Sequence, residues 1–133
     1  MASFATRIAA VLAAACLAAL PAQASDEAEA AAAMQQMLDS QGAVLDTLEA
    51  IEDAATLERH REALSDALAQ ARTDTDALAE HAEVIATARA LQAVIRPQII
   101  AHNARRKAVH ADIASRLDPA TLDKLDEIFD AAD

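Results

Sequence analysis

The sequence predicts an all-α protein, an antiparallel helical hairpin or bundle of three to four helices with a long third helix and a short C-terminal one. Large apolar residues recur at helical spacing through much of the chain, as at Leu78, Ile85 and Leu91. Beyond residue 24 there is one aromatic residue, Phe129, and one glycine, Gly42. A core of leucine, isoleucine, valine and alanine suits helices and fits a β-sheet badly.

The first 24 residues are predicted to be a targeting segment. Arg7 supplies the positive start, and residues 8–20 form an apolar run that is too short to cross a bilayer. Ala22-Gln23-Ala24 is a small-x-small cleavage site. We therefore expect a signal peptide cleaved after Ala24, a periplasmic or secreted protein, and no membrane insertion after cleavage. Lipidation at Cys16 is the alternative.

Residues 25–133 are expected to form a single all-helical domain. This part of the chain has no cysteine, which excludes disulfides, thiolate metal sites and cysteine catalysis. A small core without disulfides or aromatic residues is marginally stable alone, so we expect a homodimer. No serine–histidine–acid arrangement, paired-carboxylate site or glycine-rich phosphate loop is recognisable, so an enzyme is not expected.

The first two helices are separated by a break in the apolar pattern. The first is expected from about Asp26 to Glu52, with an apolar stripe that runs to Ile51. The stripe then loses its phase, which predicts a turn over residues 52–56 with Asp53 or Thr56 as the N-cap. The second helix should follow, from about residue 56 to residue 72.

The third and last helices are predicted from capping residues and prolines. Thr73-Asp74-Thr75-Asp76 has capping-box spacing, which predicts a turn and the start of a helix that runs to Leu117. Pro97 should kink this helix, because the apolar stripe passes through it in phase; a split into two helices is the alternative. Asp118-Pro119 pairs an N-cap with proline at the first helical position and predicts the short last helix.

Charge is distributed unevenly along the chain. Residues 25–133 hold 10 basic and 22 acidic residues, which argues against nucleic acid and anionic membranes as partners. Residues 84–117 hold six basic residues and one acidic residue, so a basic helix lies within an acidic protein. This basic face either is solvated and paired internally or binds protein clients or an envelope partner. The candidate partner-binding residues are Arg89, Arg96, Arg105, Arg106, Lys107 and Arg116.

Metal binding or metal sensing is the alternative function. His60 and His81 are expected to face each other across the hairpin of the second and third helices, and His110 is a further candidate ligand. Their spacing lacks a tight metal motif, so histidines satisfied by neighbouring carboxylates are the other interpretation. Met34 and Met37 could serve a copper(I) site or the core. No cofactor is assigned, and a divalent metal or copper stays open.

The turn before the last helix resembles a motif of the Spy/CpxP and heavy-metal-resistance family of small periplasmic helical proteins. The matching residues are Leu117-Asp118-Pro119-Ala120-Thr121, which lead to Leu122 and Leu125, and Leu38-Asp39-Ser40-Gln41 resembles a degenerate first copy. Asp118 stands where the family has threonine, and Thr121 where it has glutamine. The resemblance implies a dimeric helical envelope protein, chaperone-like or related to envelope stress, that binds unfolded clients or senses metal.

Overall fold

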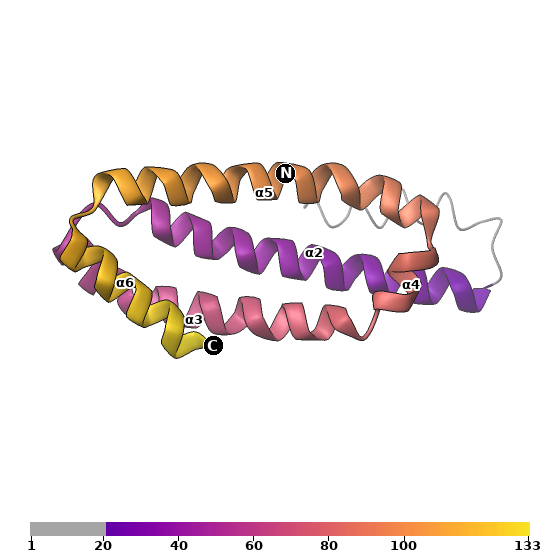
Figure 1. The fold of residues 1–133 in the computed structure, drawn as a ribbon. Helices are drawn as coiled ribbons and strands as arrows, with labels where there is room; N and C mark the ends of the chain where they lie inside the picture. The colour runs from indigo at the N-terminus through magenta and orange to yellow at the C-terminus, as the bar shows by residue number, and fades with distance from the viewer. Residues whose placement is uncertain (1–20) are drawn as a thin grey trace, which may run out of the picture.

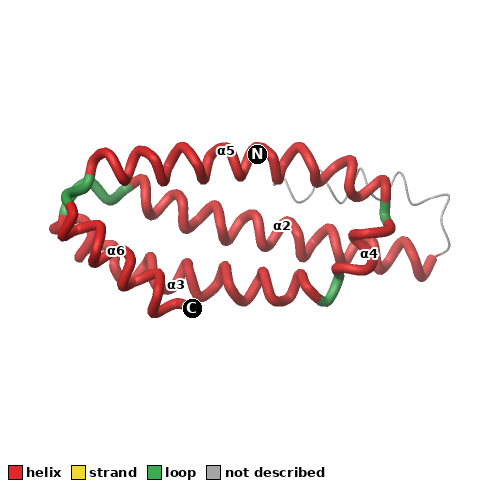
Figure 2. Tube along the Cα trace, in the orientation of Figure 1, coloured by secondary structure: helices red, strands yellow, loops and turns green. Residues whose placement is uncertain are grey.

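The computed structural model describes residues 21–133, which form five helices and no strand. The helices are α2 (Pro21–Glu49), α3 (Ala54–Ala79), α4 (Ala82–Thr87), α5 (Arg89–Arg116) and α6 (Pro119–Ala132), joined by short turns (Figure 2). The all-α prediction is confirmed. Most of the predicted signal peptide, residues 1–20, lies outside the described part of the chain. In that described part, no helix combines the length and the apolar character needed to cross a membrane.

α2 lies at the centre of the fold, packed against α3 on one side and α5 on the other (Figure 1). α2 and α3 form a long antiparallel hairpin. The short helix α4 turns the chain at the far end of this hairpin, and α5 then returns along α2 in the same direction as α2. α6 folds back from the end of α5 and packs against α3. The two helices that flank α2 therefore differ, because α6 packs against α3, whereas α5 contacts the short α4 near its start.

The turn between α2 and α3 lies where the apolar stripe breaks. Asp53 is the N-cap of α3: its Oδ1 accepts a hydrogen bond from the Thr56 backbone N–H at 2.8 Å, and Thr56 Oγ1 accepts from the Asp53 N–H at 2.9 Å. Ile51 and Leu57, on either side of this capping box, are fully buried. The capping box thus sets the direction of the chain at the point where the buried apolar residues pass to the next helix, α3.

The turn between α5 and α6 also has the predicted cap. Asp118 Oδ1 accepts a hydrogen bond from the Thr121 backbone N–H at 2.7 Å, and Pro119 occupies the first turn of α6. Proline suits this position because the first turn of a helix has no intrahelical acceptor for its N–H groups. Both caps hold the pKa of their aspartate below its ordinary value, mainly through the backbone N–H hydrogen bond from Thr56 or Thr121.

The predicted turn at Thr73–Asp76 is wrong, because α3 continues through it to Ala79. Each threonine hydroxyl there donates to the carbonyl oxygen four residues earlier, so these side chains satisfy the helix that they were expected to begin. Asp74 is buried and accepts a hydrogen bond from Gln70 Nε2 at 3.0 Å. The chain turns later, at Glu80–His81, and breaks again at Ala88.

The long basic helix is consequently shorter than predicted. α5 begins at Arg89 instead of Thr73, and α4 takes up part of the difference, so the described residues contain five helices instead of three to four. α5 continues through Pro97 as one helix (Figure 1). The exposed ring of Pro97 lies on the side of α5 away from the core, where its missing N–H leaves the packed face intact.

The core divides into two apolar clusters, and α2 contributes to both. At the end near α6, α2 and α5 meet α3 and α6 around Leu48, Leu64, Ile113 and Leu125. At the end near α4, the cluster is built from small and flexible side chains: Ala30, Ala31, Met34, Met37, Ala88, Leu91 and Ile95. Both methionines of the predicted MxxM pair are therefore core residues.

Leu64→Ala tests the cluster near α6. Leu64 is fully buried, and its truncation should lower the free energy of unfolding by about 2–5 kcal/mol. Urea unfolding followed by circular dichroism measures the change. Ile100→Ala is the control, since Ile100 is 62% exposed and its loss should have little effect on stability. Equal effects of the two substitutions would contradict the burial described here.

Acid should weaken the fold through its two caps. Asp53 and Asp118 have folded-state pKa values below 3.8, so their stabilisation is complete well above pH 3.8 and disappears as the pH falls through the folded-state values. The urea midpoint should therefore fall as the pH drops below about 4. In Asp53→Asn/Asp118→Asn, whose amides can cap without titrating, this fall should be smaller; an unchanged pH dependence would exclude these caps as its source.

Candidate functional site

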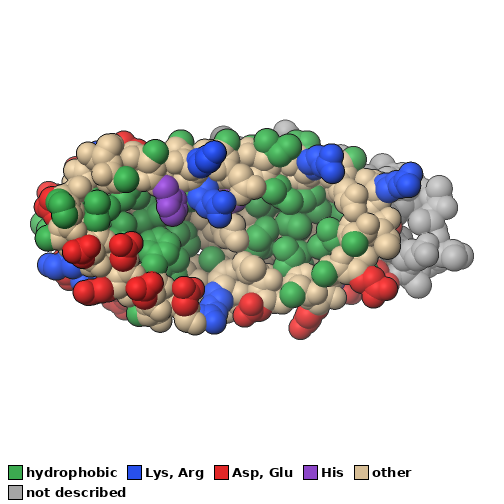
Figure 3. Space-filling model, in the orientation of Figure 1, with side chains coloured by type: hydrophobic (Ala, Val, Ile, Leu, Met, Phe, Trp, Pro, Cys, Tyr) green, Lys and Arg blue, Asp and Glu red, His purple; other side chains and the backbone are tan. Residues whose placement is uncertain are grey.

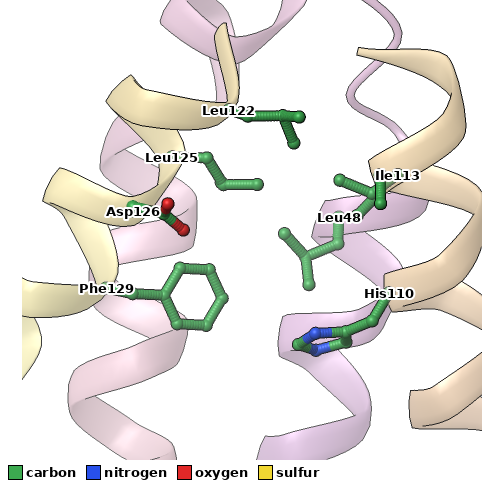
Figure 4. Close-up of a pocket in the computed structure, with 8 residues that line it drawn as sticks. Leu48, His110, Ile113, Leu122, Leu125, Asp126 and Phe129 are labelled. Carbon is green, nitrogen blue, oxygen red and sulfur yellow. The ribbon is translucent and has the colours of Figure 1, made fainter. Parts of the chain in front are cut away.

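An apolar pocket of about 330 Å³ lies between α5 and α6, with α2 beneath it (Figure 4). His110 and Phe129 point toward one another from α5 and α6, and Leu48 of α2 lies between His110 and Ile113. Asp126 is the acidic group of the lining. The residues that line the pocket are Leu48, His110, Ile113, Ala114, Leu122, Leu125, Asp126 and Phe129. Its size and mainly apolar character are typical of a small binding site.

The pocket exists because α5 and α6 pack against different helices. α5 packs against α2, whereas α6 packs against α3 and buries Thr121, Leu125 and Ile128. Leu122 and Phe129 lie on a flank of α6, roughly 90° around its axis from these buried residues, and are only partly buried. α6 therefore has more apolar surface than the helices around it cover.

The apolar surface extends beyond this pocket. Figure 3 shows hydrophobic side chains gathered in the hollow between α5 at the upper edge and α3 and α6 at the lower edge. A second apolar hollow of about 370 Å³ lies nearer α4 and is lined by Met34, Leu78 and Ile85 with neighbouring alanines. We call the pocket between α5 and α6 the α5–α6 groove and treat it as the candidate site, because charged residues flank it.

The two walls of the α5–α6 groove carry opposite charge. On α5, Arg106 lies one turn before His110 and thus on the same face of the helix. On α6, Asp126 lines the groove, and three more acidic residues of this helix are exposed: Asp123, Glu127 and Asp130. Lys and Arg side chains gather mainly along the α5 edge in Figure 3, and Asp and Glu side chains along the α6 edge. Within residues 21–133, no ion pair joins the two walls.

Two of the six predicted partner-binding residues are engaged within the fold. Arg105 Nη2 lies 3.1 Å from Glu49 Oε1 of α2 and also pairs with Asp46, and these carboxylates raise the pKa of Arg105 above its ordinary value. Arg116 donates to the Ile51 carbonyl oxygen at 2.7 Å. Arg105 and Arg116 are therefore paired within the fold, and their part in partner binding stays a prediction.

The other four predicted residues are available to a partner. Arg89, Arg96, Arg106 and Lys107 are exposed, and in the part of the chain that the structure describes none of them forms an ion pair. Nearby, partial burial and the positive charges of Arg106 and Arg105 lower the pKa of His102. Protonation of His102 is disfavoured first by its partial burial and then by the neighbouring positive charges.

The predicted pairing of His60 with His81 is wrong. His60 lies within α3 and His81 in the turn after it, so 21 residues of mostly continuous helix place them roughly 30 Å apart. They were expected to face each other because the turn was predicted at residues 73–76. His110 lies apart from both, in the α5–α6 groove. Among the described residues, no group of three or more His, Cys, Asp and Glu side chains is placed to hold a metal ion.

Arg105→Ala should weaken the attachment of α5 to α2. Because the Arg105 side chain is 39% exposed, we expect a loss of about 0.2–1 kcal/mol in the free energy of unfolding, smaller at high salt. Urea unfolding at low and high ionic strength measures this loss. Arg106→Ala is the matched control. If Arg106→Ala lowers the free energy of unfolding as much as Arg105→Ala does, the ion pairs of Arg105 with Asp46 and Glu49 do not stabilise the attachment of α5 to α2.

Comparisons with protein-family models, with curated protein sequences and with solved structures find no match to this chain. The resemblance of Leu117–Thr121 to the Spy/CpxP motif therefore stays a prediction. Within residues 21–133, the features that bear on function are the apolar groove, the exposed α5 residues Arg89, Arg96, Arg106 and Lys107 without an ion pair, and the acidic wall of α6.

Proposed function

We propose that this protein is a non-catalytic helical protein that binds acidic segments of protein partners through the basic face of α5 and the apolar groove beside it. One observation carries the proposal. Arg89, Arg96, Arg106 and Lys107 are exposed and without an ion pair in the described structure, although the chain holds twice as many acidic as basic residues. Cations that serve only the fold would be expected to pair with these abundant carboxylates, as Arg105 does.

The arrangement suits an extended protein surface better than a small ligand. The 19 residues from Arg89 to Lys107 correspond to a rise of roughly 27 Å along the helix. Ile100 lies within this stretch and is 62% exposed, the largest exposure of any big apolar side chain in the described residues. Mixed cationic and apolar groups along one helix favour segments that carry both carboxylates and large apolar side chains.

The charge balance also bears on the class of partner. A net charge of −11 repels nucleic acid and anionic lipid surfaces at long range, whereas the local positive potential of α5 attracts carboxylates within about one Debye length. A partly unfolded polypeptide that carries its carboxylates in short segments is repelled less at long range than a polyanion, and those segments can bind to α5. With the predicted export signal, this supports a chaperone-like or envelope-stress role in the periplasm, carried out by a homodimer or in complex with an envelope protein.

A client-aggregation assay tests the proposal. The protein should suppress aggregation of an acidic unfolded client more strongly than that of a basic client of similar size. Arg89→Glu/Arg96→Glu/Arg106→Glu/Lys107→Glu should raise the amount needed for half-suppression at least tenfold, because the surface then repels the client.

Two controls make this result specific. Arg59→Glu reverses an exposed arginine on α3 and should leave suppression unchanged. Arg105 stays unaltered in all variants because it anchors α5 to α2. Circular dichroism should show the same helix content throughout. Undiminished suppression by the fourfold variant would reject α5 as the binding surface.

A further inference from the structure

We propose that the α5–α6 groove binds one amphipathic helix of a partner protein, with acidic residues on the flank that faces α5 and basic residues on the flank that faces α6. This inference rests on the proposed function and names the chemistry of the partner. It depends on three features of the groove: its position in the bundle, its lining, and the opposite charge of its walls.

The position of the groove favours a helix. α5 and α6 form its two walls, and α2 forms its floor (Figure 4). Each wall has a helix on one side only, because α5 packs against α2 and α6 against α3. An amphipathic helix laid between such walls buries its apolar stripe against both, as in other helix-in-groove complexes.

The lining defines where the main apolar side chain of the partner enters. Phe129 and Leu122 of α6 are partly buried and lie across from Ile113 of α5, with Leu48 at the bottom. A leucine or phenylalanine of the partner would insert between His110 and Phe129 and remove these surfaces from water. Further apolar residues three, four and seven positions along the partner helix would continue the stripe.

The walls determine the charges on the partner. Arg106 precedes His110 by one turn on α5, and Asp130 follows Asp126 by one turn on α6, so both charges lie beside the pocket. No ion pair crosses the groove in the described structure, so neither wall neutralises the other. A helix with one acidic and one basic flank neutralises both walls at once, whereas a uniformly acidic helix is repelled by α6.

The same charges set the direction of the bound helix. The acidic flank can face α5 in only one of the two antiparallel orientations that a straight groove allows. A partner helix whose flanks are exchanged should therefore bind in the reverse direction. Direction is a property that apolar contacts alone would leave nearly undetermined.

Three synthetic helical peptides of equal length and the same apolar stripe test the inference. The first has one acidic and one basic flank, the second has the same residues with the charges mixed on both flanks, and the third is acidic on both flanks. Fluorescence anisotropy with the purified protein should give at least tenfold tighter binding for the first peptide. Equal affinity for all three peptides would overturn the inference.

Protein variants locate the bound peptide. Ala114→Trp places a large side chain at the groove and should weaken binding of the first peptide at least tenfold, whereas Ala111→Trp, at another exposed alanine of α5, should not. Arg106→Glu and Asp126→Lys should each weaken binding several-fold. If neither Ala114→Trp nor the charge reversals reduce binding, the groove is not the site.

The double variant Arg106→Glu/Asp126→Lys gives the sharpest outcome. Binding should return, with the peptide reversed, and a spin label at the peptide N-terminus should broaden amide signals at the opposite end of α6. Unchanged direction would overturn the charge argument. Client suppression that depends on α5 but comes with no preference among the peptides would reject this inference alone, whereas loss of both would reject the proposed function too.

Discussion

The fold depends on the apolar face of α2, which has to pack against two long helices at once. Leu48 and Val44 belong to one core cluster and Met34 and Met37 to the other, so α2 connects the two ends of the molecule. With almost no aromatic residues, this packing uses leucine, isoleucine, valine and methionine together with buried alanines, whose small side chains allow close approach of helices. α3 and α5 pack directly against α2, and α6 is placed by its packing against α3.

The sequence predicted those parts of the fold that local chemistry decides. Asp53 and Asp118 are N-caps at the predicted turns, because a phase break or a following proline leaves no competing structure. The prediction of a turn at Thr73–Asp76 was wrong for a related reason. Threonine and aspartate can cap the start of a helix, but they also form hydrogen bonds within a helix, and local sequence does not distinguish the two. The helix continues through these residues because α3 packs along α2 as far as Ala79.

The candidate site was harder to predict than the fold, because it depends on which helices meet. The basic character of residues 84–117 was visible in the sequence, but nothing in it separates Arg105, which pairs with Asp46 and Glu49, from its neighbour Arg106. Their different roles follow from a rotation of about 100° around α5. Phe129 could have been suspected, since it is the lone aromatic residue beyond residue 24.

The one-sided attachment of α5 has a consequence for motion. α3 is held by both α2 and α6, whereas α5 is held by α2, by the short α4 near its start, by the Arg105 pairs and by the Arg116 hydrogen bond to the Ile51 carbonyl. α5 should therefore open before the α2–α3 hairpin does, and its amide hydrogens should exchange with solvent sooner. The helix with the most positive charge would then also be the least rigid of the three long ones, able to widen the hollow beside it without unfolding the rest.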